Sequence, residues 1–125
     1  MEELVQSDMV RLSQKGNPYD RYRGRVMFPI FDLRGNVVAF GGRILTDEKP
    51  KYINTADTPV YHKSSGLFAM NFAKNAGTRQ LILAEGYMDV IALHRAGFTN
   101  AIASLGTALT EEQARIIRRY ADEAV

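Results

Sequence analysis

The chain has 125 residues, is 46% hydrophobic and 24% charged, and carries a formal net charge of +2, which together describe an ordinary globular domain with a core of its own. It contains no cysteine, which excludes disulfides, thiolate metal ligands and cysteine nucleophiles and suits a reducing compartment such as the cytoplasm. No apolar run approaches the roughly 18 residues of a spanning helix, and the acidic N-terminus lacks the pattern of a signal peptide, so no membrane role is expected.

Positive charge is concentrated in the first half of the sequence. Residues 11–63 carry ten basic and five acidic side chains, whereas residues 79–125 carry five basic and six acidic ones. This asymmetry indicates that the two parts have different roles. We therefore divide the chain into a basic part, 1–78, and a second part, 79–125.

The basic part is predicted to contain a β-hairpin. Residues 2–14 have a loosely helical spacing that Gly16-Asn17-Pro18 interrupts, so a helix end followed by a loop is expected. Residues 25–33 and 37–45 are rich in Val, Phe, Ile and Leu, and Arg34-Gly35-Asn36 between them is turn chemistry. These two runs form the hairpin.

The hairpin is followed by a segment of mixed character. Gly41-Gly42 in the second strand predicts a bulge in preference to a close approach of the backbone to another group. Residues 46–66 read as loop with a short strand at Lys51–Ile53, and a helix is expected from about Leu67 to Lys74, ending near Gly77.

From residue 79 onward the sequence alternates between strand and helix. We expect a strand at Leu81–Ala84, a helix at Tyr87–Arg95, a strand at Ala101–Ala103, and a helix that begins after Thr110 with a capping box to Gln113. This alternation predicts an α/β domain with a parallel sheet. Because a further strand should follow the last helix, the sheet is expected to be incomplete at its C-terminal end.

Two carboxylates stand out in this second part. Glu85 follows the predicted strand directly, and Gly86 permits a sharp turn into the next helix, so Glu85 is expected at the strand end where α/β sheets bind ligands. Asp89 lies in the first helical turn, beside a helix N-terminus that favours anions. The pair suits Mg²⁺ or Mn²⁺. Spacing alone leaves open, and slightly favours, a solvated strand-end Glu85 and an Asp89 that merely complements the helix dipole.

The amino-acid identities of longer sequence strings favour the metal-binding interpretation of Glu85 and Asp89. Ala84-Glu85-Gly86-Tyr87-Met88-Asp89-Val90 and Ala103-Ser104-Leu105-Gly106-Thr107 resemble the toprim module that topoisomerases and primases share. Four upstream strings follow the order and spacing of the bacterial replicative DNA primases over roughly residues 20–110. They are Arg25-Val26-Met27-Phe28-Pro29-Ile30, Ala39-Phe40-Gly41-Gly42-Arg43, Pro50-Lys51-Tyr52-Ile53-Asn54 and His62-Lys63.

The resemblance implies a toprim α/β fold preceded by part of a mixed α+β subdomain, with a basic groove between them. The implied activity is that of a DNA-directed RNA polymerase, a nucleotidyltransferase that makes short RNA primers from ribonucleoside triphosphates on single-stranded DNA for replication. Glu85 and Asp89 would be the catalytic and metal-binding residues. The implied nucleotide- and phosphate-binding set is Arg43, Lys51, Tyr52, Asn54 and Lys63. The implied template-binding set, placed on one face of an extended segment, is Arg21, Arg23 and Arg25.

Some features of the family have no counterpart in this chain. Further paired aspartates that bind metal are expected beyond residue 125. Zinc is expected only in a segment that is absent here. Contact with the replicative helicase is expected only through other absent regions. We therefore expect little primer synthesis from this chain by itself. Two alternatives are a non-catalytic single-stranded nucleic-acid-binding module and another toprim enzyme, either a topoisomerase or an RNA-maturation nuclease.

For six further residues the sequence favours a structural role or leaves the role open. His62 and His94 have no partner at a ligating spacing and are predicted to be structural. Tyr87 and Met88 are predicted to pack in the core. The Gly106-Thr107 pair either lines the same crevice as Glu85 or forms a simple strand-to-helix turn.

Overall fold

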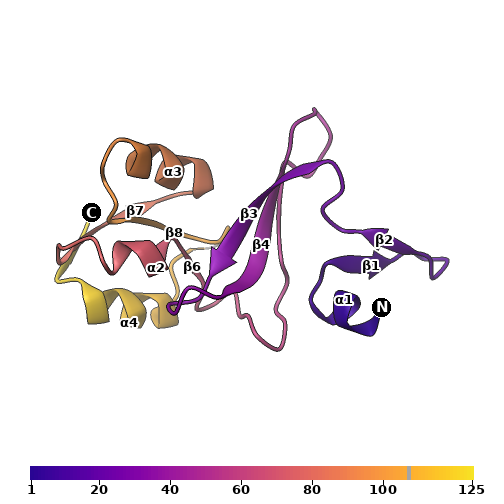
Figure 1. The fold of residues 1–125 in the computed structure, drawn as a ribbon, viewed down its shortest axis with the longest axis horizontal. Coiled ribbons are helices and arrows are strands. Elements are labelled where there is room, and N and C mark those ends of the chain that lie inside the picture. Colours follow the sequence, from indigo (N-terminus) through magenta and orange to yellow (C-terminus); the bar gives the residue numbers. More distant parts are fainter. Residues whose placement is uncertain (107) are drawn as a thin grey trace.

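The computed structural model of the protein describes residues 1–106 and 108–125, and three sheets lie in a row across this part of the chain (Figure 1). At one end of this row lies the N-terminal unit, which consists of α1 (Glu2–Gln6) and a two-stranded antiparallel sheet of β1 (Val10–Leu12) and β2 (Pro18–Asp20). The middle sheet contains β3 (Arg25–Phe31), β4 (Val37–Ile44) and β5 (Tyr52–Asn54). The other end holds a four-stranded sheet with its helices.

The predicted hairpin is confirmed as β3 and β4. Its turn is closed by Asp32, whose carboxylate accepts hydrogen bonds from the backbone amides of Arg34 and Asn36 and from the Asn36 side chain. These bonds, those from Asn36 above all, lower the pKa of Asp32. The second strand therefore begins at Val37 as predicted, whereas the first ends at Phe31, two residues earlier than predicted, because Asp32 already belongs to the turn.

The two glycines of β4 are not a bulge, so that prediction is wrong. Gly41 and Gly42 stay in register with β3, and the irregularity lies instead between Ile30 and Phe31. A methyl group built on Gly41 would lie 2.5 Å from the hydroxyl oxygen of Tyr87. The close approach that we considered less favoured explains the glycine, because an aromatic ring covers the backbone there.

The second part of the chain forms the sheet expected from its strand and helix alternation. Its elements are β6 (Leu67–Phe68), α2 (Met70–Ala73), β7 (Gln80–Ala84), α3 (Tyr87–Arg95), β8 (Ala101–Ser104), α4 (Glu111–Tyr120) and β9 (Glu123–Ala124). The strand order is β6-β8-β7-β9, with β7 parallel to both β8 and β9 and β6 antiparallel to β8. The parallel arrangement is confirmed for the predicted strands, within a sheet of mixed direction.

Two boundaries in this sheet differ from the prediction. The helix expected from Leu67 begins only at Met70, because Leu67–Phe68 pairs with β8 as an edge strand. The strand expected after the last helix already starts as β9, whose register places Glu123 opposite Gln80. Strand pairing between residues far apart in the sequence determines where α2 and β9 begin, and a local sequence pattern cannot predict such pairing.

Helices cover both faces of the four-stranded sheet (Figure 1). On one face Val90 of α3 packs against Ala101 and Ala103 of β8. On the other face Ile102 packs with residues of α2 and α4, among them Ile117. The small alanines on the α3 side let that helix lie close to the strands. α4 begins with the capping box that Thr110 and Gln113 predicted. None of the helices in the part of the chain described here has the length and apolar character needed to cross a bilayer.

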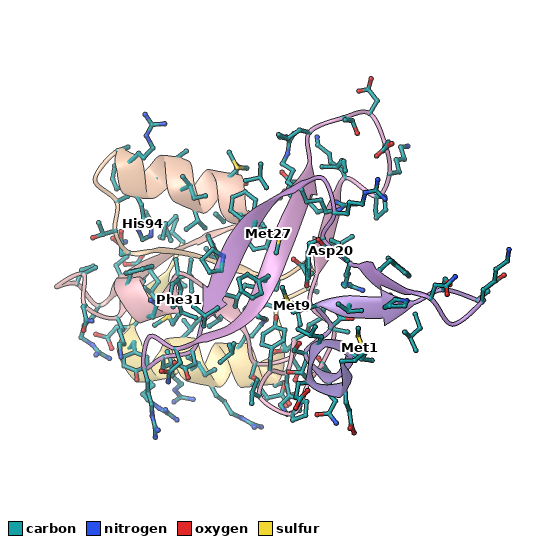
Figure 2. The ribbon with its side chains drawn as sticks, turned by 45° about the vertical axis from the view of Figure 1, so that its right-hand side comes forward. Met1, Met9, Asp20, Met27, Phe31 and His94 are labelled. Carbon is teal, nitrogen blue, oxygen red and sulfur yellow. The ribbon has the colours of Figure 1, made fainter. Side chains whose placement is uncertain are left out.

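The hairpin contacts the four-stranded sheet at its end as well as through Tyr87. Phe31 at the end of β3 meets the Phe72 ring edge-to-face, with ring centroids 5.8 Å apart, beside α2 (Figure 2). Lys74, directly after α2, donates a hydrogen bond from its ammonium to the Leu33 carbonyl. The middle sheet is therefore held against the second part of the chain at more than one point.

The N-terminal unit was expected to be a helix end and loop, and this prediction was incomplete. β1 and β2 form a small hairpin closed by a hydrogen bond from the Ser13 amide to the Asn17 carbonyl. Buried Asp8 connects the unit to the middle sheet, because its carboxylate accepts a 2.7 Å hydrogen bond from the Ala56 amide and pairs with Arg21 at 3.0 Å.

We predict that Gly41→Ala lowers the free energy of unfolding by about 1–3 kcal/mol, the usual cost of forcing extra volume into a packed contact. The added methyl group must displace Tyr87, whose side chain is only 6% exposed. Urea denaturation followed by circular dichroism measures the change. The matched control is Gly86→Ala, where nothing lies within 4 Å of the new methyl group. Equal stability of Gly41→Ala and the unmodified chain would contradict the steric account.

Candidate functional site

Glu85 and Asp89 expose their carboxylates beside the N-terminus of α3. Glu85 comes directly after β7, a strand whose neighbours run parallel to it. Gly86 is the extended N-cap residue of α3, which places Asp89 in the first helical turn. Within the described residues neither carboxylate takes part in a hydrogen bond or an ion pair. We call this pair the acidic corner; both of its side chains are free to bind a cation.

Tyr87 lies between these two carboxylates in sequence, yet its ring is buried against the middle sheet. The ring stacks on Phe28 of β3 with centroids 5.2 Å apart and meets the edge of Phe68 at 4.7 Å. The hydroxyl group donates a hydrogen bond to the side-chain oxygen of Asn54 at the end of β5. The predicted core packing of Tyr87 is confirmed, and this side chain joins the acidic corner to the middle sheet.

Arg43 and Tyr52 form a pair on the face of the middle sheet that Tyr87 covers. The two residues are directly opposite each other in the β4–β5 register, and Gly41 and Asn54 are opposite each other two residues away. Because strand residues two apart share a face, Arg43 and Tyr52 lie on the same face as the Tyr87 contact. The Arg43 Nε donates to the Tyr52 hydroxyl at 3.1 Å, and the guanidinium carbon lies 5.6 Å from the Tyr52 ring centroid.

The structure thus brings together three of the residues predicted to bind nucleotide or phosphate. Arg43, Tyr52 and Asn54 share one face, and the rings of Tyr52 and Tyr87 lie 6.4 Å apart. Tyr87, which lies between Glu85 and Asp89 in the chain, therefore links the acidic corner to the sheet that carries Arg43. Sequence reasoning did not find the role of Phe28, whose only sequence signal is its place on the apolar face of the hairpin.

The two predicted lysines lie on loops. Lys51 is exposed immediately before β5, and its carbonyl accepts hydrogen bonds from the Ile44 amide at 2.9 Å and from Arg25 at 3.2 Å. Lys63 is half-buried in the loop that faces α4, where its amide donates to the Asp57 carboxylate at 2.9 Å. In residues 1–106 and 108–125 neither ammonium group has a partner. Their nucleotide contacts stay predictions.

The three predicted template arginines do not share one extended face, so this part of the prediction is wrong. Residues 21–24 form a turn, with Gly24 in the left-handed region at φ 69°. Arg21 donates to the Asn54 carbonyl at 2.6 Å and pairs with Asp8, and only Arg23 extends into solvent.

Arg25 has structural partners of its own. Its guanidinium donates to the Pro50 carbonyl at 2.6 Å and to the Lys51 carbonyl at 3.2 Å. Arg25 lies opposite Ile44 in the β3–β4 register, one position away from Arg43, so the two arginines are on opposite faces of the sheet. Template contact by Arg21, Arg23 and Arg25 stays a prediction.

Four further residues had either a predicted structural role or an open role. The Nε2 of His94 donates a 2.9 Å hydrogen bond to the Ala101 carbonyl, a structural contact, and the side chain lies between α3 and the sheet (Figure 2). Met88 is 50% exposed, so its predicted core packing is wrong. A methyl group on Gly106 would lie 3.2 Å from the side-chain nitrogen of Asn54, which puts Gly106 at the same junction. Thr107 lies outside the described residues.

The donor chemistry of the acidic corner fits a hard divalent cation. Mg²⁺ is commonly bound through one or two carboxylates, with waters and substrate phosphates completing its octahedron. Glu85 and Asp89 are of this type and have no partner among residues 1–106 and 108–125. The part of the chain that the structure describes contains no cluster of three or more His, Cys, Asp or Glu side chains suited to a metal. The two carboxylates therefore fit a partial Mg²⁺ or Mn²⁺ site and give no support for zinc.

A cavity of about 370 Å³ lies elsewhere, between the β3–β4 turn, the loop around Tyr61 and Ile116 of α4. None of the predicted catalytic, nucleotide-binding or template-binding residues lines it. Exposed carboxylates and cations suit a solvent-facing site for phosphates better than this mainly apolar cavity does. We therefore locate the candidate site at the acidic corner and the Arg43–Tyr52 pair.

Comparisons with known proteins identify the family of the chain. Residues 1–74 match the family model described as the DNA primase catalytic core, N-terminal domain, and residues 79–125 match the model of the Toprim domain. The DNA primase of Clostridium acetobutylicum is 48% identical over 124 residues, which are 98% of this chain and 21% of that protein. The chain thus spans about a fifth of the length of the relatives it matches.

Solved structures show the same fold. The E. coli primase catalytic core matches with a TM-score of 0.93 at 39% identity, covering 98% of this chain and 40% of that one. A DnaG primase catalytic domain bound to single-stranded DNA matches with a TM-score of 0.91 at 41% identity, again covering 98% and 40%. The predicted toprim fold, preceded by a mixed α/β subdomain, is confirmed.

Alkaline pH should destabilise the fold. Burial raises the pKa of the Tyr87 phenol and of the Tyr61 phenol, which also lies in this core. An unfolded tyrosine ionises near pH 10, so above that pH the unfolded chain releases protons that the fold retains, and stability falls as pH rises. Urea unfolding between about pH 8 and pH 11 measures this slope.

The double variant Tyr61→Phe/Tyr87→Phe should flatten the slope, whereas Tyr19→Phe, which changes a tyrosine that is 49% exposed, should leave it unchanged. A slope that is the same in all three proteins would contradict the assignment to the buried phenols.

Proposed function

The chain belongs to the DNA primase catalytic core family, and from this premise we propose that it forms part of the RNA polymerase core of a bacterial primase. In this role it contributes to nucleotidyl transfer, which joins ribonucleotides into short primers on single-stranded DNA during replication. One observation carries the proposal: Glu85 and Asp89, which have no partner among the described residues, flank Tyr87 in the chain, and the Tyr87 ring lies 6.4 Å from the Tyr52 ring on a second sheet.

Glu85 and Asp89 are proposed to hold Mg²⁺ or Mn²⁺ at the acidic corner. A divalent cation bound there would supply Lewis-acid stabilisation of the charge on a reacting phosphate. The first turn of α3 adds the positive end of a helix dipole on the same side. Glu85 directs the cation from the strand end, and Asp89 supports it from the helix, so that two rigid elements fix the site.

Arg43 and its neighbours are proposed to bind the nucleotide. The Arg43 guanidinium presents several donors to phosphate oxygens and keeps its charge throughout the reaction. Tyr52 holds this guanidinium from one side, and Asn54 marks the point where the sheet meets the acidic corner. Lys51 and Lys63 add mobile positive charge at the edge of the site. A cleft lined by cations raises the local concentration of nucleotide triphosphates and offsets charge that develops during transfer.

The template and the cellular setting extend the same proposal. Arg21, Arg23 and Arg25 are proposed to contact the template backbone, and the similarity to a primase domain bound to single-stranded DNA supports this. Ribonucleoside triphosphates and the RNA primer are the other proposed partners, and the replicative helicase would bind parts of the primase beyond these residues. The proposed location is the bacterial cytoplasm, within the primosome.

The match of residues 1–74 to the N-terminal domain of the primase core favours primase over other toprim enzymes, such as topoisomerases and RNA-maturation nucleases. A module that only binds single-stranded nucleic acid is the remaining alternative for the isolated chain. Its exposed cations would suffice for that role. A measurement of nucleotide incorporation distinguishes this binding module from the proposed function, because only the proposed function includes catalysis.

We predict that Glu85→Gln abolishes Mg²⁺-dependent ribonucleotide incorporation by a longer primase polypeptide that contains this chain. The substitution keeps the shape of the side chain but removes the charge that binds the cation. The 125-residue chain alone should give no detectable primer, because two carboxylates are too few for a two-metal centre. Glu112→Gln, at an exposed position on α4, is the matched control. Incorporation by the Glu85→Gln protein, or primer formation by the isolated chain, would contradict this assignment.

We predict that Arg43→Ala and Lys51→Ala each weaken binding of a single-stranded oligonucleotide or a nucleoside triphosphate. For the oligonucleotide, each lost phosphate contact should reduce the slope of log affinity against log salt by roughly 0.7. Fluorescence titrations of the purified chain at several salt concentrations measure both quantities. Arg34→Ala removes the same charge from the exposed hairpin turn and should leave the slope unchanged. Equal effects of all three substitutions would indicate only nonspecific electrostatic attraction.

A further inference from the structure

Tyr87 has three independent contacts that a simple core residue would not need. The ring covers Gly41 so closely that an alanine there would place its methyl group 2.5 Å from the phenolic oxygen. The ring also stacks on Phe28 with an interplanar angle of 16°. The hydroxyl hydrogen bonds to Asn54, although nonpolar packing alone would be satisfied by phenylalanine. Together these contacts fix the position of the ring, its tilt and its distance from the end of β5.

The position of Tyr87 in the chain makes these contacts relevant to the site. Tyr87 is the first residue of α3, two residues after Glu85 and two before Asp89. Its partners Gly41 and Asn54 lie two residues from Arg43 and Tyr52 on the same face of the middle sheet. A movement of the ring relative to this sheet therefore changes the separation between the carboxylates and the guanidinium group.

The partner residue Asn54 is itself held firmly. Its carbonyl accepts a 2.6 Å hydrogen bond from Arg21, and Arg21 pairs with buried Asp8. The next residue, Thr55, is 1% exposed and shares a 2.6 Å hydrogen bond with the Tyr22 hydroxyl. The hydroxyl of Tyr87 is thus attached to a rigid point, which makes it suitable for setting a distance.

We propose that Tyr87 is a positioning residue that sets the separation between the acidic corner and the Arg43–Tyr52 face, and so couples cation binding to nucleotide binding. This inference rests on the proposed function of both groups. Neither ligand needs to touch Tyr87. Its hydroxyl acts through Asn54, so that a cation on the carboxylates and a triphosphate on the cations meet at a fixed distance. Coupling of this kind is reciprocal: each ligand raises the affinity for the other by the same factor.

The first test measures geometry without any ligand. The chain has no cysteine, so Met88→Cys, at a position that is 50% exposed, gives one site for a nitroxide spin label next to Tyr87. The label broadens amide signals of Gly41, Arg43 and Tyr52 according to their distance. Adding Tyr87→Phe should weaken this broadening and reduce the difference in broadening between residues along β4 and β5. The ring keeps its packing in this variant but loses the hydrogen bond to Asn54.

Tyr61→Phe is the matched control for this experiment. Tyr61 is a tyrosine of the same core, 4% exposed, whose hydroxyl has no hydrogen-bond partner within the described residues. Its substitution should leave the broadening unchanged. An unchanged pattern in the Tyr87→Phe protein, or an equal change in both variants, would overturn the proposal whether or not the chain binds nucleotide.

The second test measures coupling with Mn²⁺ and ATP as the probes. The affinity for ATP is measured with and without Mn²⁺, and the ratio gives the coupling factor, which for linked sites typically lies between about 5 and 150. Tyr87→Phe should reduce this factor roughly threefold or more, the scale of one lost hydrogen bond. The separate affinities for Mn²⁺ and for ATP should each stay within about twofold, as expected when the groups that bind them are intact.

The outcomes separate this inference from the proposed function. Loss of coupling with intact separate affinities supports Tyr87 as a positioning residue. A coupling factor that is unchanged in the Tyr87→Phe protein means that the residue only stabilises the fold, and overturns the proposal. An unmodified chain that binds neither Mn²⁺ nor ATP contradicts the proposed function, and the spin-label experiment then decides the role of Tyr87 in geometry.

Discussion

The contact of the Tyr87 ring with the bare backbone of Gly41 is the constraint on which the arrangement of the two parts depends. The second part of the chain carries the carboxylates, and the first part carries most of the positive charge. A glycine in β4 opens the space into which the first side chain of α3 inserts. Close-packed interiors tolerate little extra volume, so this single contact defines how near the helix can approach the sheet. Stacking on Phe28 and the edge-to-face contact with Phe68 then prevent the ring from tilting.

A second set of contacts holds the opposite side of the same strand end. Asp8 accepts a hydrogen bond from the Ala56 amide, Arg21 donates to the Asn54 carbonyl, and Tyr22 bonds to Thr55. The short segment after β5 is therefore bound by the N-terminal unit through its backbone and by Tyr87 through a side chain. Such a buried polar network is specific because each member would cost free energy if left unpaired. This segment therefore links the N-terminal unit, the middle sheet and α3, in addition to the contacts that Phe31 and Leu33 make beside α2.

Local patterns predicted the parts of the structure that depend on neighbours in sequence. The β3–β4 hairpin, the strand and helix around Glu85 and the capping box of α4 follow from apolar spacing and turn residues. The features that local patterns missed arise from long-range contacts. Gly41 was predicted to form a bulge because sequence does not reveal the ring above it. Arg21 was predicted to share an extended face with Arg23 and Arg25 because sequence does not reveal its pairing with Asp8 or the turn at 21–24. The assignment of Glu85 and Asp89 as metal ligands depended on the resemblance of whole strings, since spacing alone left it open.

The spacing that Tyr87 maintains also explains how opposite charges can lie near each other and stay available. A carboxylate and a guanidinium in contact would form an ion pair, and each would then lose affinity for external ligands. Here Arg43 is bound to Tyr52, and Glu85 and Asp89 have no partner within the described residues. The rings of Tyr87 and Tyr52 form an aromatic layer at this junction, with centroids 6.4 Å apart. A cation and a phosphate that bind together would bridge this layer, because each satisfies the charge that the fold leaves unpaired. Under the proposed function, these groups are complementary to a pair of ligands, one cation and one phosphate, as a metal-dependent phosphoryl-transfer site requires.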